Sequence, residues 1–579
     1  MKKTTCPLDC FDACSVIYEN GKLKGDKEHP TTQGYLCPNL NSYLKTPRIE
    51  NPRYKGEEIS MDKALEILEE NLESTHDKPS LYFKGQGNFG KMQDITSLFF
   101  KEHGATFTRG SLCDGAGEAG IIEGRGASLS LPFEEIAKAE VVVVWGRNIQ
   151  TTNSHIYPYI KDKIIVVIDP VETEIAKKSD LFLQIKPRSD LFVAVLMARF
   201  AYIDVMEDEE FIEERGDEWD YFVDFIRSYP MKKLMRRCGI PAVEIITALL
   251  LIQDRKTVFL VGVGVQKYSH GHSVLRMIDS FAAMMGKFGK EGCGVSYLGN
   301  SGFGFENPFV RPKKTVPIPT VDFGAYDSVF IQGANPANQM PRTEKVIEGL
   351  KKSKFVTYFG LYENETSQLA DLVIPAKNFL EKEDVRFSYG HQYVGAMPKL
   401  EEGVVGICEY DLTARLMEKF GYEKLEDSST YIEKIVNSNA RDEGDYKVSK
   451  SYDTIPYHDK FYTDDEKFIF LDEIDDDGLR EQGFHLITSK HKHSLNSQFK
   501  RAFCVHLPPS AGFSDGDRVR CSSKYGAFEF EVKVDDTLRD DSLLIYSGTH
   551  GVNYLTPDKL SEEGDSAVFQ DVKVQVDGV

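Results

Sequence analysis

The sequence has no long apolar run and no excess of positive charge. Its 70 lysines and arginines are outnumbered by 91 aspartates and glutamates, which gives a net charge of −21 at pH 7. This balance argues against a nucleic-acid-binding protein, which needs a basic surface. A membrane-spanning helix needs about 18 consecutive apolar residues, whereas Val141–Trp145 and Ile164–Ile168 are runs of five. We therefore expect neither nucleic-acid binding nor direct membrane insertion.

Cysteine is also scarce, with 10 among 579 residues, which excludes a scaffold built on disulfides. The stretch from Met1 to Cys6 has no room for an apolar signal region or a twin-arginine leader. We therefore expect a cytoplasmic protein. No Ser/His/Asp triad or two-carboxylate hydrolase pattern is recognisable from spacing. The length of the chain predicts roughly three to five domains.

The cysteines that are present gather near the N-terminus. Cys6, Cys10 and Cys14 are four positions apart, and Cys37 follows 23 positions later. Thiolates are the usual ligands of iron–sulfur clusters, normally four to a cluster. Zinc is the main alternative, although structural zinc sites favour two close cysteine pairs. The spacing favours a [4Fe–4S] cluster.

The middle of the chain alternates short apolar strands with helices. An amphipathic helix is expected after Ser60, a plausible N-cap. Strands are expected at residues 81–83, 141–144, 164–168, 258–261, 328–331 and 355–359. This alternation predicts parallel sheets covered on both faces, whose ligands bind at the carboxyl ends of the strands. After about residue 483, closely spaced strands at 484–488, 518–522, 528–534 and 542–546 predict a separate β-barrel-like domain.

Two glycine-rich segments are candidate ligand-binding loops. Gly262-Val263-Gly264 has Lys267 where the dinucleotide fingerprint requires its third glycine, so NAD binding is not indicated there, although its amides suit a phosphate or a pterin. Cys113 lies among several glycines, which let the backbone approach a bulky group. It is either a thiolate stabilised by a helix start or a small buried apolar side chain.

Taken in order, these motifs resemble the molybdopterin oxidoreductases of the dimethyl sulfoxide reductase and formate dehydrogenase superfamily. The resemblance runs nearly end to end. Beyond the four N-terminal cysteines it rests on Val144–Asn148, Ile168–Pro170, Pro187–Asp190, Gly262–Gln266, Gly289–Gly294, Asn335–Pro336, Ala370–Pro375, Asn496–Gln498, Asp515–Asp517 and Asn553–Asp558.

The resemblance implies an α/β multidomain fold around two pterin guanine dinucleotides that hold one molybdenum or tungsten. A small N-terminal [4Fe–4S] domain would span residues 1–55. Two interleaved, doubly wound α/β domains would follow: a discontinuous one at 56–120 and 321–475, and a pterin-binding one at 121–320. The C-terminal dinucleotide-binding β-barrel domain would span 480–579.

The same resemblance assigns roles to residues. Cys113 falls on the position of the protein's own metal ligand, and Asp169 and Asp190 match positions that would hold guanine edges. The remaining positions expected to contact the cofactor are Trp145, Gly146, Asn148, Gly262, Gly264, Gln266, Asn335, Asn496 and Asn553.

The chain departs from the family pattern at three places. Asn39 stands where many members have a lysine between cluster and pterin, and Asp114 follows the metal ligand where formate dehydrogenases have histidine. The stretch Ser296 to Ser301 also lacks their arginine, so formate oxidation is disfavoured. Asp114 and Glu118 are either proton-transferring carboxylates or residues that face water or cap a helix.

The predicted function is two-electron oxidation or reduction of a small substrate, with electrons relayed through the cluster to a partner protein. Two alternatives remain open. One is a non-redox hydratase or transhydroxylase of the same fold, and the other is a non-catalytic electron-transfer or scaffold subunit.

Overall fold

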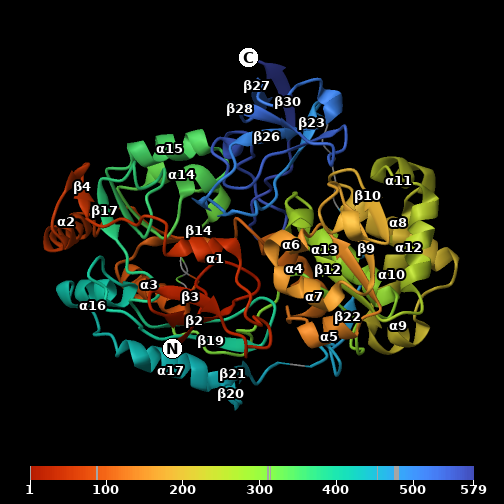
Figure 1. Cartoon of the computed structure of the whole chain (residues 1–579), viewed down its shortest axis with the longest axis horizontal. Coiled ribbons are helices and arrows are strands. Elements are labelled where there is room, and N and C mark those ends of the chain that lie inside the picture. The colour runs from red at the N-terminus through yellow and green to blue at the C-terminus, as the bar shows by residue number, and fades with distance from the viewer. Residues whose placement is uncertain (1, 87–88, 310–311, 313, 453, 475–480) are drawn as a thin grey trace. The chain divides into compact units, whose positions relative to one another are not determined.

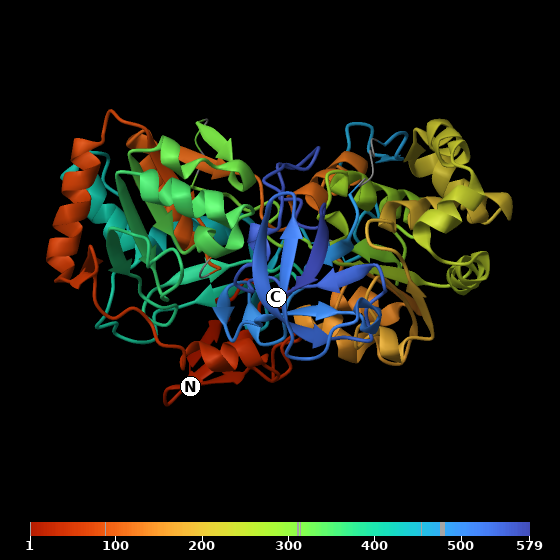
Figure 2. The same ribbon diagram turned by 90° about the horizontal axis from the view of Figure 1, so that it is seen from above.

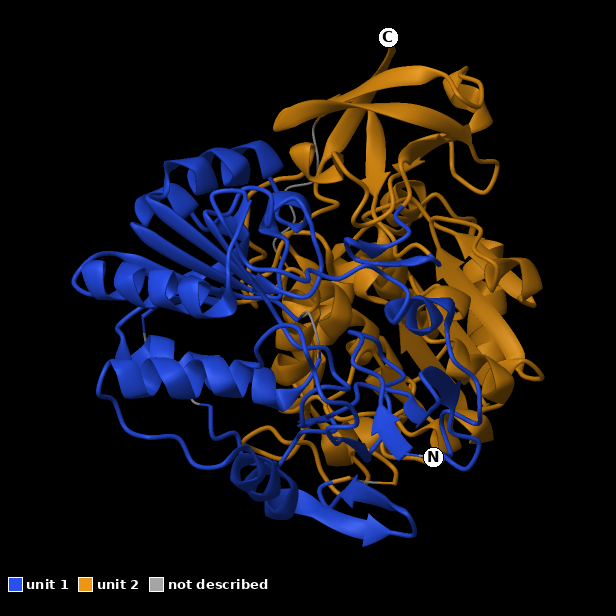
Figure 3. Ribbon diagram, turned by 60° about the vertical axis from the view of Figure 1, so that its left-hand side comes forward, with its two compact units in different colours: residues 1–109, 301–451, 492–501 blue, residues 110–300, 452–491, 502–579 orange. Residues whose placement is uncertain are grey.

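The computed structural model describes residues 2–86, 89–309, 312, 314–452, 454–474 and 481–579. The chain divides into two compact units (Figure 3). Unit 1 holds residues 1–109, 301–451 and 492–501, and unit 2 holds residues 110–300, 452–491 and 502–579. Each unit is therefore discontinuous in sequence. The domain boundary expected at 475–480 lies outside the described residues, and the individual domain limits remain predictions.

Unit 1 is built on an eight-stranded sheet. Its order is β14 (Thr315–Pro317), β7 (Thr106–Arg109), β6 (Ser80–Lys84), β15 (Ser328–Gln332), β16 (Phe355–Gly360), β17 (Leu372–Pro375), β4 (Arg53–Tyr54) and β5 (Glu57–Glu58). The first six strands run parallel, and the last two are antiparallel to their neighbours. From the adjacent pair β6 and β15 the chain winds outward in both directions, which makes this pair the switch point of a doubly wound sheet.

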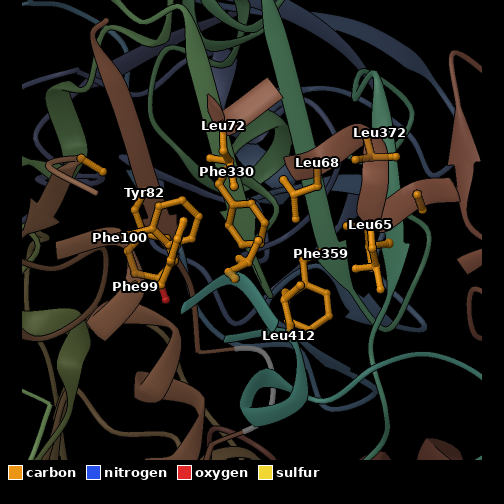
Figure 4. Close-up of a cluster of buried hydrophobic side chains, with 14 of the residues drawn as sticks. Leu65, Leu68, Leu72, Tyr82, Phe99, Phe100, Phe330, Phe359, Leu372 and Leu412 are labelled. Atoms are coloured by element: carbon orange, nitrogen blue, oxygen red, sulfur yellow. The ribbon is translucent and has the colours of Figure 1, made fainter. Parts of the chain in front are cut away.

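Helix α2 (Met61–Ser74) shows how the helices cover this sheet. It begins as predicted at Ser60, whose hydroxyl accepts a hydrogen bond from the Lys63 amide at 3.2 Å. Its buried leucines and two phenylalanines of the sheet belong to one core: Leu65, Leu68, Leu72, Phe330 and Phe359 (Figure 4). Burial of each such side chain contributes about 1.5–3 kcal/mol.

Two smaller sheets complete the part of unit 1 that concerns the cysteines. The first is antiparallel and consists of β1 (Lys2–Thr5), β2 (Ser15–Glu19) and β3 (Lys22–Gly25). The second contains β18 (Asp384–Arg386), β19 (Tyr393–Met397), β21 (Tyr446–Ser449) and β20 (Ala440–Glu443). Cys6, Cys10 and Cys14 lie between β1 and β2, and Cys37 directly precedes the short helix α1 (Pro38–Tyr43).

Unit 2 contains a five-stranded parallel sheet (Figure 1). Its order is β10 (Leu181–Gln184), β9 (Ile164–Asp169), β8 (Val141–Trp145), β12 (Thr257–Val261) and β13 (Gly294–Ser296). All residues of β8 are fully buried, as expected for a parallel strand covered on both faces. Helices α4 (Gly115–Arg125), α8 (Asp190–Ile203) and α13 (Gly271–Met284) pack together beside it. The switch point of this sheet lies between β8 and β12.

The C-terminal part of unit 2 is a closed six-stranded barrel (blue in Figure 2). Its strands, in order around the barrel, are β23 (Phe484–Ile487), β29 (Ser542–Leu544), β26 (Cys504–Leu507), β28 (Gly526–Val534), β27 (Arg518–Ser523) and β30 (Lys573–Gly578). The α/β multidomain fold with a C-terminal β-barrel is thus confirmed. Every described helix is too short or too polar to span a bilayer.

Candidate active site

The four N-terminal cysteines are brought together in unit 1. The Cys6 amide donates to the Cys14 carbonyl at 2.8 Å, which closes the loop between them. Burial, and secondarily the neighbouring Cys37 thiol, raise the pKa of Cys6 to about 12. Burial and the neighbouring thiols also raise the pKa of Cys10 and of Cys14 well above the usual range. The thiols therefore lie close enough to influence one another's ionisation.

The backbone of this loop is held by side chains from β18 and the segment that follows it. The buried Arg386 guanidinium donates to the carbonyl oxygens of Cys6, Leu8 and Cys10 at 2.5, 2.8 and 3.2 Å. The Ser388 hydroxyl donates to the Phe11 carbonyl at 2.9 Å, and His391 Nε2 donates to the Asp12 carbonyl at 2.9 Å. Nothing in the local sequence indicated these three residues, because their partners lie 376 to 380 positions away.

The arrangement of the thiols bears on the metal they suit. Within the described ranges, no three His, Cys, Asp or Glu side chains are placed to bind one metal ion. A tetrahedral zinc site needs four ligands about 2.0–2.3 Å from one ion. A cubane cluster instead takes each thiolate on a different iron. The [4Fe–4S] assignment is compatible with the donor set and remains a prediction.

In unit 2, two glycine loops meet at the switch point of the parallel sheet. A Cβ atom on Gly262 would lie 1.9 Å from the carbonyl oxygen of Gly146. Gly146 has φ of +57°, and a Cβ atom there would lie 2.4 Å from a methyl group of Val265. These two glycines are therefore required for the loops after β8 and β12 to pack closely. A Cβ atom on Gly264 would make only an ordinary contact at 3.6 Å.

Polar groups are buried beside these loops without protein partners. The Asn148 Oδ1 atom and both side-chain polar atoms of Gln150 have no hydrogen-bond partner in the described part of the chain. Leaving such a buried group unsatisfied costs about 1–3 kcal/mol. A ligand with hydrogen-bonding edges would satisfy these atoms, and the pterin dinucleotide expected here has them. Gln150 was not predicted from sequence.

Two carboxyl groups are buried near the same strand ends. Burial raises the pKa of Asp169 to about 7, partly offset by the Val171 amide, and Asp190 adds to the rise. Burial also raises the pKa of Asp190 to about 6 against the hydrogen bond that it accepts from Trp145 Nε1 at 2.9 Å. Because the indole of Trp145 is fully buried, its N–H group is fixed and holds the Asp190 carboxyl group in place. Buried carboxyl groups suit the adjacent N–H donors of a guanine edge, which fits the expected cofactor.

Cys113 directly precedes Asp114 at the start of α4, and its backbone is fixed from both sides. Its amide donates to the Ser111 hydroxyl at 2.8 Å, and its carbonyl accepts from Gln266 Nε2 at 2.5 Å. The Gln266 Oε1 atom accepts from the Gly117 amide at 3.0 Å. Gln266, predicted to contact the cofactor, therefore joins the Cys113 loop to the first turn of the helix.

Three charged residues lie around this loop. Asp114 occupies the N-cap position of α4, but its carboxylate accepts from the Ser111 hydroxyl at 2.8 Å rather than capping the helix. Burial raises the pKa of Glu118, and Asp114 adds to that rise. Burial lowers the pKa of Lys267, while the neighbouring Cys113 and Asp114 oppose this change. Lys267 was not predicted as a site residue.

Of the three remaining asparagines, Asn335 and Asn496 lie in loops, and Asn553 lies in the 3-10 helix Val552–Tyr554. Asn335 follows β15 at the switch point of unit 1, where its amide donates to Glu365 at 2.8 Å and to Ser497 at 3.0 Å. Asn496, also in unit 1, has φ of +51° between two short strands. Asn553, in unit 2, accepts a hydrogen bond from the Thr556 hydroxyl at 3.2 Å. Their contacts with a cofactor remain predictions.

Comparison with known proteins identifies the family. Residues 44–394 match the family model "Molybdopterin oxidoreductase", and residues 510–573 match the model "Molydopterin dinucleotide binding domain". The probable oxidoreductase YoaE of Bacillus subtilis is 24% identical, with 100% of this chain and 98% of that protein covered. The F420-dependent formate dehydrogenase subunit alpha of Methanocaldococcus jannaschii is 25% identical, with coverage of 75% and 73%.

Among solved structures, acetylene hydratase from Pelobacter acetylenicus has the same fold. The TM-score is 0.83 at 16% sequence identity, and both chains are covered completely. At this identity the likeness shows the fold alone. Because the first family model spans more than half of the chain, the protein is an enzyme of the molybdopterin oxidoreductase family, with a molybdopterin dinucleotide cofactor that holds molybdenum or tungsten.

Proposed function

We propose that the chain is the catalytic subunit of a molybdenum- or tungsten-dependent enzyme that oxidises or reduces a small substrate by two electrons. A [4Fe–4S] cluster on Cys6, Cys10, Cys14 and Cys37 relays the electrons singly to a partner protein. The observation that carries the proposal is the gathering of these four thiols, two buried and two half-buried, around a loop whose carbonyl groups are bound by Arg386, Ser388 and His391.

The residues of unit 2 that hold the cofactor lie at the carboxyl ends of the strands of its doubly wound sheet. Asp169 and Asp190 accept hydrogen bonds from a guanine edge, and Asn148 contacts the pterin portion. Cys113 is the protein's ligand to the metal, because a soft thiolate suits a metal already bound by sulfur. When bound, the group supplies the two-electron redox chemistry.

The residues around Cys113 position it and handle protons. Gln266 fixes the carbonyl of Cys113 and the first turn of α4 together, so the thiol is presented from a constrained backbone. The Asp114 carboxylate, oriented by the Ser111 hydroxyl, is the proton-transferring group that we propose for the reaction. A positioned carboxylate of this kind typically contributes about 10²–10⁴-fold to a rate.

A non-redox hydratase is the second candidate. One feature of the sequence favours it: Asn39 replaces the lysine that many family members place between the cluster and the pterin. In such an enzyme the substrate gains the elements of water, and no electrons pass to a partner.

The two candidates are separated by assaying anaerobically purified protein with and without a one-electron dye. Nitrate, for which a relative is named, and acetylene, for which a protein of the same fold is named, are suitable first substrates. The redox proposal predicts dye-dependent turnover, lost in Cys113→Ala with iron content unchanged and retained in the control Cys408→Ala. Turnover of substrate without dye would favour the hydratase, and full dye-dependent activity of Cys113→Ala would refute the assigned ligand.

A further inference from the structure

The outer face of the C-terminal barrel carries a second group of reactive side chains. Strand β26 alternates, so that Val505 and Leu507 are fully buried in the barrel core while Cys504 and His506 share the opposite face. Neither Cys504 nor His506 takes part in the proposed redox reaction. Two side chains on one face of a strand, two residues apart, are close enough to interact.

The neighbouring strand brings a carboxylate to this face. Strand β28 runs parallel to β26 with Val534 opposite Leu507. The chain then continues to Asp535, whose amide donates to the Leu507 carbonyl at 2.8 Å. This hydrogen bond fixes the backbone that carries the carboxylate.

The three side chains form a linear series of hydrogen bonds. Nδ1 of His506 donates to Oδ2 of Asp535 at 2.9 Å, and the ring's other nitrogen, Nε2, lies 3.5 Å from the Sγ atom of Cys504. The second carboxylate oxygen of Asp535 accepts from the amide and hydroxyl of Thr537 at 3.1 and 2.5 Å. Thiol, imidazole and carboxylate therefore stand in the order that activates a cysteine nucleophile.

The surroundings favour a charged imidazole beside the sulfur. Burial opposes the charge, but hydrogen bonds to Asp535 and Cys504 outweigh it and raise the pKa of His506 to about 9. Burial of Asp535 is likewise outweighed by its hydrogen bonds from His506 and Thr537, which lower the pKa of Asp535 to about 2. The ring of Tyr546 packs edge-on against His506, with centroids 5.1 Å apart.

The other charged groups nearby are on the adjacent strand and its turn. Lys533 lies opposite His506 in the strand register. Its hydrogen bond to Asp515 is the main cause that raises its pKa, and Cys504 and Asp535 add smaller contributions. Its ammonium forms an ion pair with Asp515. Glu531 lies opposite Cys504 in the register, so the positive charge next to the sulfur is the His506 imidazolium at 3.5 Å. A neighbouring imidazolium is typical of reactive cysteines.

We propose that Cys504, His506 and Asp535 form an activated-thiol site at which a small disulfide modifies the protein. The charged His506 stabilises the thiolate of Cys504, which forms by loss of its proton to solvent and attacks one sulfur of the disulfide. The disulfide's own S–S bond breaks as the new one forms, and the leaving thiolate takes a proton from solvent. Cys504 is oxidised to a mixed disulfide, and one small thiol is released for each disulfide consumed.

Cys408 provides an internal comparison of similar, intermediate exposure. Its sulfur accepts a hydrogen bond from the Asp411 amide at 3.4 Å, and burial raises its pKa to about 12. If exposure alone governed reactivity, the two cysteines would react at comparable rates. If the imidazole activates the thiol, Cys504 reacts much faster.

The test treats the anaerobically purified full chain at pH 7 with 5,5′-dithiobis(2-nitrobenzoate). Reaction is stopped at intervals with N-ethylmaleimide, and peptide mass spectrometry measures the modification of each cysteine. We expect Cys504 to react at least ~10-fold faster than Cys408, and His506→Gln and Asp535→Asn each to slow Cys504 by ~10-fold or more. His485→Gln, on β23 of the same barrel, is the matched control and leaves the rate unchanged.

The comparison of two cysteines within the unaltered protein does not depend on whether a variant folds. Equal rates for Cys504 and Cys408 would overturn the proposal. So would an unchanged Cys504 rate in His506→Gln and Asp535→Asn proteins that melt as the parent does. Because the measurement needs neither metal nor substrate turnover, its outcome is independent of the proposed redox function.

Discussion

The guanidinium of Arg386 binds the carbonyl oxygen of Cys6 at 2.5 Å, across 380 positions of sequence. The same side chain also donates to the carbonyl groups of Leu8 and Cys10. A loop that must present several thiols to one centre cannot also satisfy its own carbonyl groups through regular secondary structure. A single buried arginine supplies the missing donors and places a positive charge beside the thiols.

Replacing Arg386 with methionine should reduce the iron content of the protein to less than half. Three buried carbonyl groups lose their donor, at about 1–3 kcal/mol for each one left unsatisfied. Iron per chain is measured in anaerobically purified protein. Arg518→Met, at a side chain that is 70% exposed, is the control and should keep its iron. Full iron content in Arg386→Met would contradict the assigned role.

Replacing Gln266 with glutamate should lower the molybdenum or tungsten content several-fold while leaving iron unchanged. The substitution keeps an acceptor for the Gly117 amide but removes the donor to the Cys113 carbonyl. A lost hydrogen bond of this kind costs about 0.5–1.5 kcal/mol. Metal content is measured beside that of Gln575→Glu, an exposed control on the barrel. Equal occupancy in both variants would argue against this positioning role.

Replacing Asp169 with asparagine should weaken retention of the cofactor but stabilise the cofactor-free protein at higher pH. The pKa of Asp169 is about 7 in the folded chain against an ordinary value of 3.8. The folded state thus holds this proton more tightly than the unfolded state, so stability falls as pH rises from about 4 to about 7. Because asparagine does not titrate, the variant does not lose stability over this pH range.

We therefore expect cofactor-free Asp169→Asn to melt at a higher temperature than cofactor-free parent protein at pH 8, with little difference at pH 4. Protein produced in a host that cannot make the cofactor is suitable for these melts. The same variant made in a competent host should retain less dinucleotide, as measured by guanine release. A pH dependence identical to that of the parent would show that Asp169 is not buried as described.

Breaking the ion pair between Arg125 and Asp279 should destabilise unit 2. The Arg125 Nε atom lies 2.7 Å from Asp279 Oδ2, and both side chains are almost fully buried. Arg125 is the last residue of α4, the helix that starts beside Cys113. Asp279→Asn leaves a buried charge uncompensated, at about 3–5 kcal/mol.

Thermal melting measures this loss, with the exposed pair Arg518–Glu529 as the comparison. Glu529→Gln should cost no more than about 1 kcal/mol, and so should hardly change the melting temperature. A change in Asp279→Asn as small as that in Glu529→Gln would show that the buried pair does not stabilise the helix.

Much of the fold could be predicted from local patterns. The valine run of β8 and the Ser60 cap follow from burial and capping rules that act within a few residues. The closeness of the four thiols could also be anticipated, since three of them share one loop. The glycines Gly146 and Gly262 were predicted as cofactor contacts, and the structure adds that their loops also need them for packing against each other.

The site residues that the sequence did not predict are defined by contacts between segments that lie far apart in the chain. Arg386 meets the cysteine loop because β19, the strand paired with β18, packs against β1, and sequence spacing does not reveal this contact. The site at Cys504 has no motif in the sequence, because Asp535 directly follows strand β28 and reaches His506 through the parallel register of the barrel. Gln150 and Lys267 carry no motif, and only their burial beside the strand ends singles them out.

The account depends most on the claim that sulfur atoms of this chain bind two separate inorganic centres. Metal analysis of anaerobically purified protein, with electron paramagnetic resonance before and after reduction, tests it directly. We predict about four irons per chain, as one cubane cluster requires, a signal that appears on reduction, and molybdenum or tungsten in addition. Folded and active protein without iron, or with zinc in its place, would contradict the claim.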